Sequence, residues 1–197
     1  MPSLLRKFGL AKRLTNKEKK LIFTKLFEFA KGDVEKRFNV RVPLKVFFSK
    51  KDLGHYIARE NHREVEELEK ILGLPRGWGE EAIAMFFSLT LMFPRSSFSV
   101  EADGVILNLD SIQPSSKKKL KGEEKVVNWV LEADITALRL IFRALPSEIK
   151  EILTLEELVN QHSVSGLIDV LEMLRAEGLV KKEYIPQELK VRLLRML

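Results

Sequence analysis

Apolar residues recur at helical spacing along the last third of the chain. From Val164 onward they stand at positions i, i+3, i+4, i+7 and i+10, which is one stripe of an amphipathic helix. A shorter apolar face precedes this stripe, directly after Thr154 and Glu157, which have the spacing of a capping box. The pattern predicts two helices joined by a tight turn, with Ser163 capping the second and Gly178 ending it in the left-handed conformation.

The first half of the chain has similar helix signals. Thr15 and Glu18 form a second capping box, which predicts a helix over residues 16–31 that Gly32 ends. A strongly helical pattern also covers residues 51–72, where an aspartate stands near the start and Gly-Leu-Pro follows the end.

Two stretches have the pattern of strands. Residues 40–48 are rich in Val and Phe but contain Pro43, which cannot donate a ladder hydrogen bond, so this strand lies at a sheet edge or starts late. Residues 98–109 predict a β-hairpin around the two-residue turn Asp103-Gly104. We expect the three strands to form a small antiparallel sheet.

Residues 80–93 are apolar on nearly every side. Such a helix is buried all round, either at the centre of a domain or in a subunit contact. We place the preceding Trp78 in the core, with an interface as the alternative. The apolar run is much shorter than the roughly 20 residues that span a bilayer, so no membrane span is predicted.

A lysine-rich segment with Pro, Ser and Gly divides the chain at residues 113–125, which predicts a linker. The predicted fold class is α+β and mostly helical. Residues 1–112 form an N-terminal α+β domain with a basic arm, and residues 126–197 form a second domain ending in an amphipathic helix. In that domain we expect Asp134 to cap the first helix.

The second domain resembles a winged helix-turn-helix DNA-binding domain. The resemblance covers residues 132–185 and rests on Ser163-Val164-Ser165, Leu171, Leu174 and Glu177-Gly178-Leu179-Val180. It implies that the helix after Ser163 is a recognition helix that enters the major groove, and that residues 181–185 form a wing strand that reaches phosphates.

The composition of the chain predicts a packed core and a cellular compartment. Hydrophobic residues make up 45% of the chain and cysteine is absent, so we expect a packed core without disulfides. Lys and Glu are abundant, a bias typical of thermostable proteins. No signal peptide is evident, which predicts a soluble, cytoplasmic protein.

The net charge of +6 is distributed unevenly. Residues 1–31 contain nine Lys and Arg against two Glu, a net charge of +7. Residues 123–180 contain five cations against eleven acids, a net of −6, and residues 181–197 five against two, a net of +3. The cations therefore lie at the two ends and in the linker, outside the body of the predicted winged helix.

The favoured hypothesis is a transcription regulator that binds duplex DNA, as a possible homodimer. Cations that meet phosphates supply most of the sequence-independent affinity for DNA. The residues expected to contact DNA are Ser163, Ser165, Arg175, Lys181, Lys182, Lys117, Lys118 and Lys119.

The alternative is a protein-interaction or oligomeric assembly module. The exposed positions of the predicted recognition helix are Ser165, Gly166, Asp169, Glu172 and Arg175. Two of them are acidic and oppose phosphates, so an acidic face of the winged helix meets a basic partner or a second copy under this hypothesis.

Catalysis is not expected. His55 and His62 share a helix face, but their spacing is no metal signature, and a solvated charged helix is the simpler interpretation. Glu101, Asp103 and Asp110 gather near the hairpin without a lysine at a nuclease-like spacing. We therefore predict neither an enzyme nor a cofactor, and the sequence leaves a small-molecule ligand open.

Overall fold

A computed structural model describes residues 13–90, 98–100, 104–113 and 122–180. The chain forms two compact units. The first, here called the body, comprises the described parts of residues 1–43 and 112–197, and the second comprises residues 44–111. Each unit is described by itself.

In the residues that the structure describes, the body begins with helix α2 (Asn16–Phe38). The predicted capping box is confirmed, because Thr15 N donates to Glu18 Oε2 at 2.7 Å and Glu18 N donates back to the Thr15 hydroxyl at 3.3 Å. The predicted stop at Gly32 is wrong. The helix continues because Val34 in the next turn is buried in the core, and it ends where Asn39 adopts the left-handed conformation.

Helix α6 (Gly122–Ala144) is the second long helix of the body. It starts inside the predicted linker 113–125, and its first turn contains Glu123 and Glu124, which favour a helix N-terminus. Asp134 is therefore not a cap, as was predicted, but a buried residue in the middle of α6. Its neighbours on the buried face are apolar.

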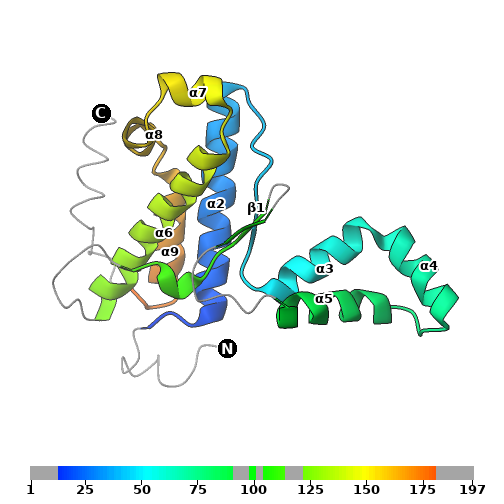
Figure 1. The fold of residues 1–197 in the computed structure, drawn as a ribbon. Coiled ribbons are helices and arrows are strands. Elements are labelled where there is room, and N and C mark those ends of the chain that lie inside the picture. The colour runs from blue at the N-terminus through cyan, green and yellow to red at the C-terminus, as the bar shows by residue number, and fades with distance from the viewer. Residues whose placement is uncertain (1–12, 91–97, 101–103, 114–121, 181–197) are drawn as a thin grey trace. The chain divides into compact units, whose positions relative to one another are not determined.

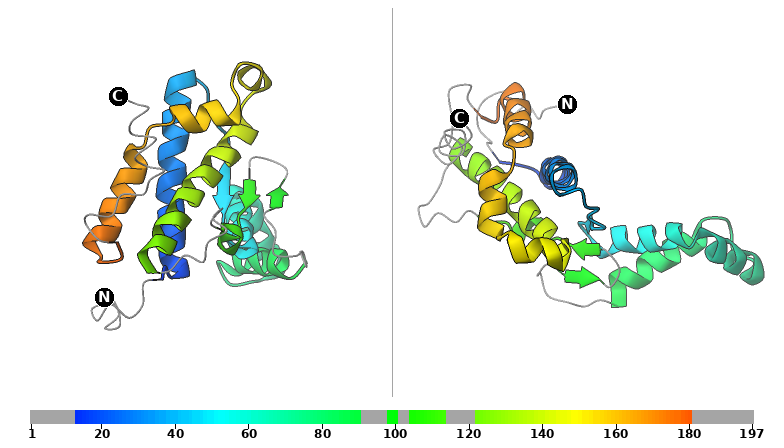
Figure 2. Two further views of the ribbon diagram at one scale, coloured as in Figure 1. Left: turned by 90° about the vertical axis from the view of Figure 1, so that its left-hand side faces the viewer. Right: turned by 90° about the horizontal axis from the view of Figure 1, so that it is seen from above.

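Three shorter helices follow α6 in the described residues of the body. They are α7 (Ser147–Ile152), α8 (Leu155–Gln161) and α9 (Ser165–Ala176). The predicted capping box of Thr154 and Glu157 opens α8, and Gly178 takes the predicted left-handed conformation after α9, with φ of 72°. Figures 1 and 2 show α2, α6 and α9 packed beside one another, with α7 and α8 at the end where α6 finishes.

The body combines the two ends of the chain, which differs from the predicted boundary between residues 112 and 126. One face of α2 is apolar and packs on α6 and α9. Its buried residues are Ile22, Phe23, Leu26, Phe27, Ala30 and Val34. Burying an aromatic side chain contributes about 1.5–3 kcal/mol relative to exposure, so this helix belongs energetically with residues 122–180.

The second unit contains a three-stranded sheet in the order β1-β3-β2, from β1 (Lys45–Phe47), β3 (Gly104–Ile106) and β2 (Phe98–Val100). Strands β2 and β3 are antiparallel, but β1 pairs with β3 in parallel. The prediction of a purely antiparallel sheet is therefore wrong. The late start of β1 and its edge position agree with the presence of Pro43.

The hairpin turn also differs from the predicted one. Val100 pairs with Gly104, so Gly104 belongs to β3 and not to a two-residue turn with Asp103. The intervening residues 101–103 lie outside the described part of the chain. A 3₁₀ turn, η1 (Leu109–Ser111), follows the strand.

Three helices form the other part of this unit: α3 (Lys50–Glu60), α4 (His62–Leu72) and α5 (Trp78–Thr90). The predicted single helix over 51–72 is broken at Asn61. The N-cap of its first part is Ser49, not Asp52. The predicted stop at Gly73 is confirmed by its φ of 64°. Helices α3 and α4 follow one another along α5, so we call these elements the three-helix layer (Figure 1).

In the described residues, no helix combines the length and the apolarity needed to cross a membrane.

Candidate functional site

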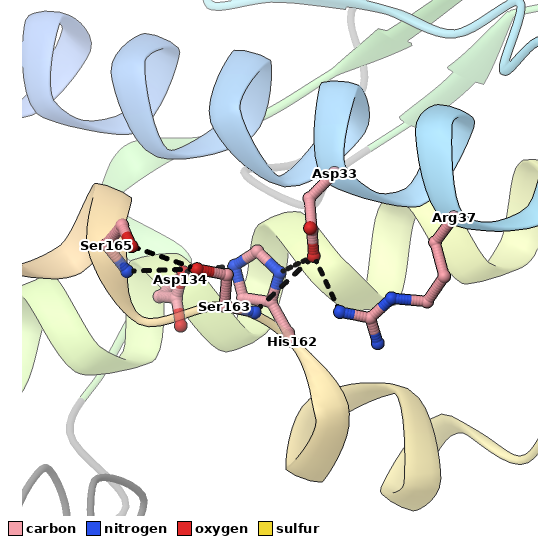
Figure 3. A network of polar contacts seen from close by, with 6 residues as sticks. All are labelled: Asp33, Arg37, Asp134, His162, Ser163 and Ser165. Carbon is pink, nitrogen blue, oxygen red and sulfur yellow. Dashed lines mark hydrogen bonds and ion pairs between the residues drawn. The ribbon is translucent and has the colours of Figure 1, made fainter. Parts of the chain in front are cut away.

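A polar network holds the turn between α8 and α9 to α2 (Figure 3). His162 Nδ1 lies 3.0 Å from Asp33 Oδ2. A carboxylate can only accept, so the ring N–H donates this bond. On the other side of the ring, His162 Nε2 lies 3.8 Å from Asp134 Oδ1 of α6, and both of these side chains are buried. One histidine thus bridges three helical segments.

Further contacts extend the network to the surface. Asp33 Oδ2 also accepts from Ser163 N at 3.4 Å and pairs with Arg37 at 3.2 Å. The Ser163 hydroxyl lies 3.0 Å from the Ser165 hydroxyl. The Ser163 hydroxyl therefore contacts Ser165 rather than the histidine ring. Asp33 and His162 together position the turn between α8 and α9.

The start of α9 is covered by α2. Gly166 is buried, and a Cβ built on it would lie 2.4 Å from Phe29 Cγ. The Phe29 ring also packs edge-on against His162, with centroids 5.8 Å apart. Gly166 was predicted to be exposed on a recognition helix, and this prediction is wrong because the helices approach closely here.

The outer face of α9 is acidic. Ser165, Asp169 and Glu172 are exposed, whereas Arg175 is half-buried. Ser163 is also half-buried and is not the predicted N-cap, since that position belongs to Val164. Of the three predicted DNA contacts that the structure describes, Ser163 and Ser165 come together.

Arg175 lies about 15 Å from Ser165 along the helix, at a rise of about 1.5 Å per residue. Lys117, Lys118, Lys119, Lys181 and Lys182 lie outside the described residues, as does the predicted wing strand 181–185. The predicted convergence of these lysines with α9 therefore stays a prediction.

The three-helix layer has small residues on its inner side. Gly54 of α3 approaches α5 so closely that a Cβ on it would lie 2.6 Å from Ala84 Cα. Ala58 and Ala84 are buried as well. Small side chains let two helix backbones approach, but they bury little apolar surface of their own.

Large apolar residues occupy the outer side of the same layer. The exposed ones are Leu68, Ile71, Leu72, Leu74, Trp78, Met85 and Phe86. Trp78 is 62% exposed and Phe86 61%, so the predictions that Trp78 lies in the core and that the helix is buried all round are wrong. We call this set, together with the exposed Ala82, the apolar face.

The apolar face draws its residues from two helices and the turn between them. On α4, Leu68 and Leu72 are four residues apart, and on α5 Trp78, Ala82, Met85 and Phe86 have the spacing i, i+4, i+7, i+8. Each set therefore forms one stripe on its helix. The stripes border the contact in which Gly79 of α5 packs on Val65 and Glu69 of α4.

Polar contacts hold the layer together from within. Glu80 Oε1 of α5 lies 3.0 Å from His55 Nδ1 and accepts from Arg59 Nε at 2.9 Å, both on α3. The buried Glu69 accepts from Gly79 N at 2.7 Å. A carboxylate at a helix N-terminus satisfies a free N–H and complements the helix dipole.

Sequence reasoning missed Asp33, His162 and the outward direction of α5. The one available signal was Asp134, a carboxylate on the apolar side of α6 that requires a buried polar partner. A subunit contact was one of the two interpretations of the apolar residues 80–93. Periodicity alone does not predict which side of a helix is covered by a neighbouring element.

No protein-family model, curated protein or solved structure matches this chain.

Proposed function

We propose that the protein is a protein-interaction module that docks a partner on the apolar face of the three-helix layer. The observation that carries this proposal is the amount of large apolar side chain that the layer leaves exposed. Leu53 and Val65 are buried within its helices, but Trp78, Met85 and Phe86 are at least 60% exposed. Soluble proteins rarely expose contiguous apolar patches of more than a few hundred Å² unless a partner covers them.

The layer is also suited to binding without reorganisation. The contacts of Glu80 with His55 and Arg59, and of Glu69 with Gly79, connect its three helices. A rigid surface loses less conformational freedom on association than a flexible one. Large aromatic side chains on such a surface are typical binding hot spots, which Trp78 and Phe86 supply.

Site-specific photocrosslinking tests this proposal. A benzophenone amino acid replaces Met85 in the full chain, and the matched control replaces Ile152, an isolated apolar residue of α7 that is 76% exposed. We expect protein adducts at position 85, whether with a second copy or with another protein, and few at position 152. A chain that gives no adducts at position 85 contradicts the proposed function.

Duplex DNA is the second candidate, and one face of α2 favours it. Lys17, Lys25 and Lys36 are exposed on that face, which also includes the exposed Glu28. Their spacing places them on one side of the helix, where they can meet phosphates. The outer face of α9 lacks exposed cations in the described residues and contains Asp169 and Glu172, so DNA contact through α2 has more support than docking by α9.

Salt titration of binding to duplex DNA tests the second candidate. We expect the affinity to fall with salt and the slope of log K against log salt to decrease by about 1 for each of Lys17→Glu and Lys36→Glu. Lys150→Glu on α7 is the control at an exposed lysine away from this face. An absence of binding at low salt excludes a DNA-binding function.

A further inference from the structure

The exposed stripe of α5 is symmetric about its centre. Trp78 precedes Ala82 by four residues and Phe86 follows it by four, so all three share one side of the helix. The two aromatic side chains are almost equally exposed, at 62% and 61%. An aromatic residue therefore flanks a small exposed residue at equal distances on either side.

This arrangement is complementary to itself. When two α5 helices lie antiparallel about a two-fold axis at Ala82, Trp78 of each copy faces Phe86 of the other. A two-fold interface uses the same patch on both copies, so each contact occurs twice. Ala82 meets its own counterpart on the axis, where a small side chain lets the two helices approach.

The size of the apolar face matches that of a stable interface. Its seven large residues are between 38% and 79% exposed. Together they present on the order of 800 Å² of surface, which is about what each partner buries in an interface of standard size. The face is therefore large enough to form a stable interface with a second copy.

The charge around the face also fits a second copy. Residues 50–90 contain six Lys and Arg against eight Asp and Glu, a net charge of −2. Like charges across an interface are unfavourable, but this nearly neutral layer repels its own copy little. The strongly acidic residues 123–180, with a net charge of −6, belong to the body.

We propose that the apolar face binds the same face of a second copy of this chain, with a two-fold axis at Ala82. This inference rests on the proposed protein-interaction function and names its partner. The three helices form a single layer. A helix with a wide apolar surface needs a second layer of structure to bury that surface. The second copy supplies that layer.

Disulfide trapping tests the position of the axis. The chain has no cysteine, so Ala82→Cys introduces a single thiol that meets its counterpart across the axis. Two cysteines form a disulfide when their Cα atoms are about 4.4–6.8 Å apart. We expect mild oxidation to convert Ala82→Cys to a covalent dimer, while Ile152→Cys, at an exposed site of the body, stays largely uncrosslinked.

Sedimentation of the full chain tests the association itself. We expect twice the chain mass of 22.7 kDa for the wild type and the single chain mass for Ala82→Lys and for Ala82→Glu, because each variant places like charges on the axis. A one-to-one mixture of these two variants should regain the dimer. Ile152→Lys and Ile152→Glu are the controls and should sediment as the wild type does.

Two results overturn the inference. One is a wild-type chain that sediments as a monomer at all soluble concentrations, and the other is a dimer that persists in both Ala82 variants. If the wild type is monomeric and the benzophenone at position 85 still captures a different protein, the second copy is the wrong partner but the interaction function stands. If position 85 captures nothing, both proposals fall.

Discussion

Asp33 Oδ2 and His162 Nδ1 lie 3.0 Å apart, although 129 residues separate them along the chain. This bond connects α2 to the turn between α8 and α9. It is therefore a tertiary contact that fixes where α9 begins.

Replacing His162 should destabilise the body. His162→Ala removes the ring between Asp33 and Asp134, so we expect the free energy of unfolding to fall by about 1–3 kcal/mol, the cost of leaving a buried polar group without its hydrogen bond. Urea denaturation followed by circular dichroism measures the change. Asp169→Asn on the exposed side of α9 is the control, and an equal loss there contradicts the role of the network.

Gly166→Ala should disturb the contact between α2 and α9. The added Cβ lies 2.4 Å from Phe29 Cγ, so we expect a loss of about 1–3 kcal/mol from overpacking. Phe29→Leu in the same chain should recover part of that loss. Gly32→Ala is the matched control, because no atom lies within 4 Å of its Cβ, and it should stabilise α2 by about 0.5–1 kcal/mol.

Gly54→Ala should open the three-helix layer. Its Cβ would lie 2.6 Å from the backbone of Ala84, which cannot move aside as a flexible side chain can. We expect faster hydrogen exchange in α3 and α5, with exchange in the body unchanged. Protection that is unchanged in α3 and α5 would show that the two helices do not depend on this close approach.

Acid should weaken the cap of α8. Thr154 donates from its backbone N–H and its hydroxyl to the Glu157 carboxylate, and these bonds lower the pKa of Glu157 below its usual 4.5. A lowered pKa means that the bonds contribute stability above about pH 4.5 and that the contribution is lost as pH falls through the folded-state pKa. Glu157→Gln should therefore be less stable than the wild type at pH 7.

The difference between Glu157→Gln and the wild type should shrink in acid, as measured by denaturation at a series of pH values. Thr154→Ala, which removes the other half of the box, should cost about 1 kcal/mol. A gap between Glu157→Gln and the wild type that is constant across pH would show that the ionised carboxylate is not what stabilises the helix start.

The two tryptophans should report separately on the two units. Trp78 is 62% exposed and Trp129 is 6% exposed. In Trp129→Phe the remaining fluorophore is Trp78, which acrylamide should quench readily in dilute protein. Quenching should weaken as the protein concentration rises, because a second copy then covers the apolar face. With Trp78→Phe, quenching should be weak throughout. Equal quenching of Trp78 at all concentrations argues against self-association.

Features that depend on residues close together in the chain could be predicted from the sequence. The capping boxes at Thr15 and Thr154 were confirmed, as were the stops at Gly73 and Gly178. Each involves residues at most a few positions apart, so the physics of a single helix end is sufficient to predict it.

Which side of each helix is covered could not be predicted in this way, because it depends on tertiary contacts. Asp134 has the sequence context of a cap but lies in the core beside His162, and Trp78 has the context of a core residue but lies at the surface. Burial depends on neighbours that are distant in the chain, and helical periodicity identifies an apolar side without naming what packs on it. The apolar face of α5, on which the proposed function rests, could be identified only in three dimensions for that reason.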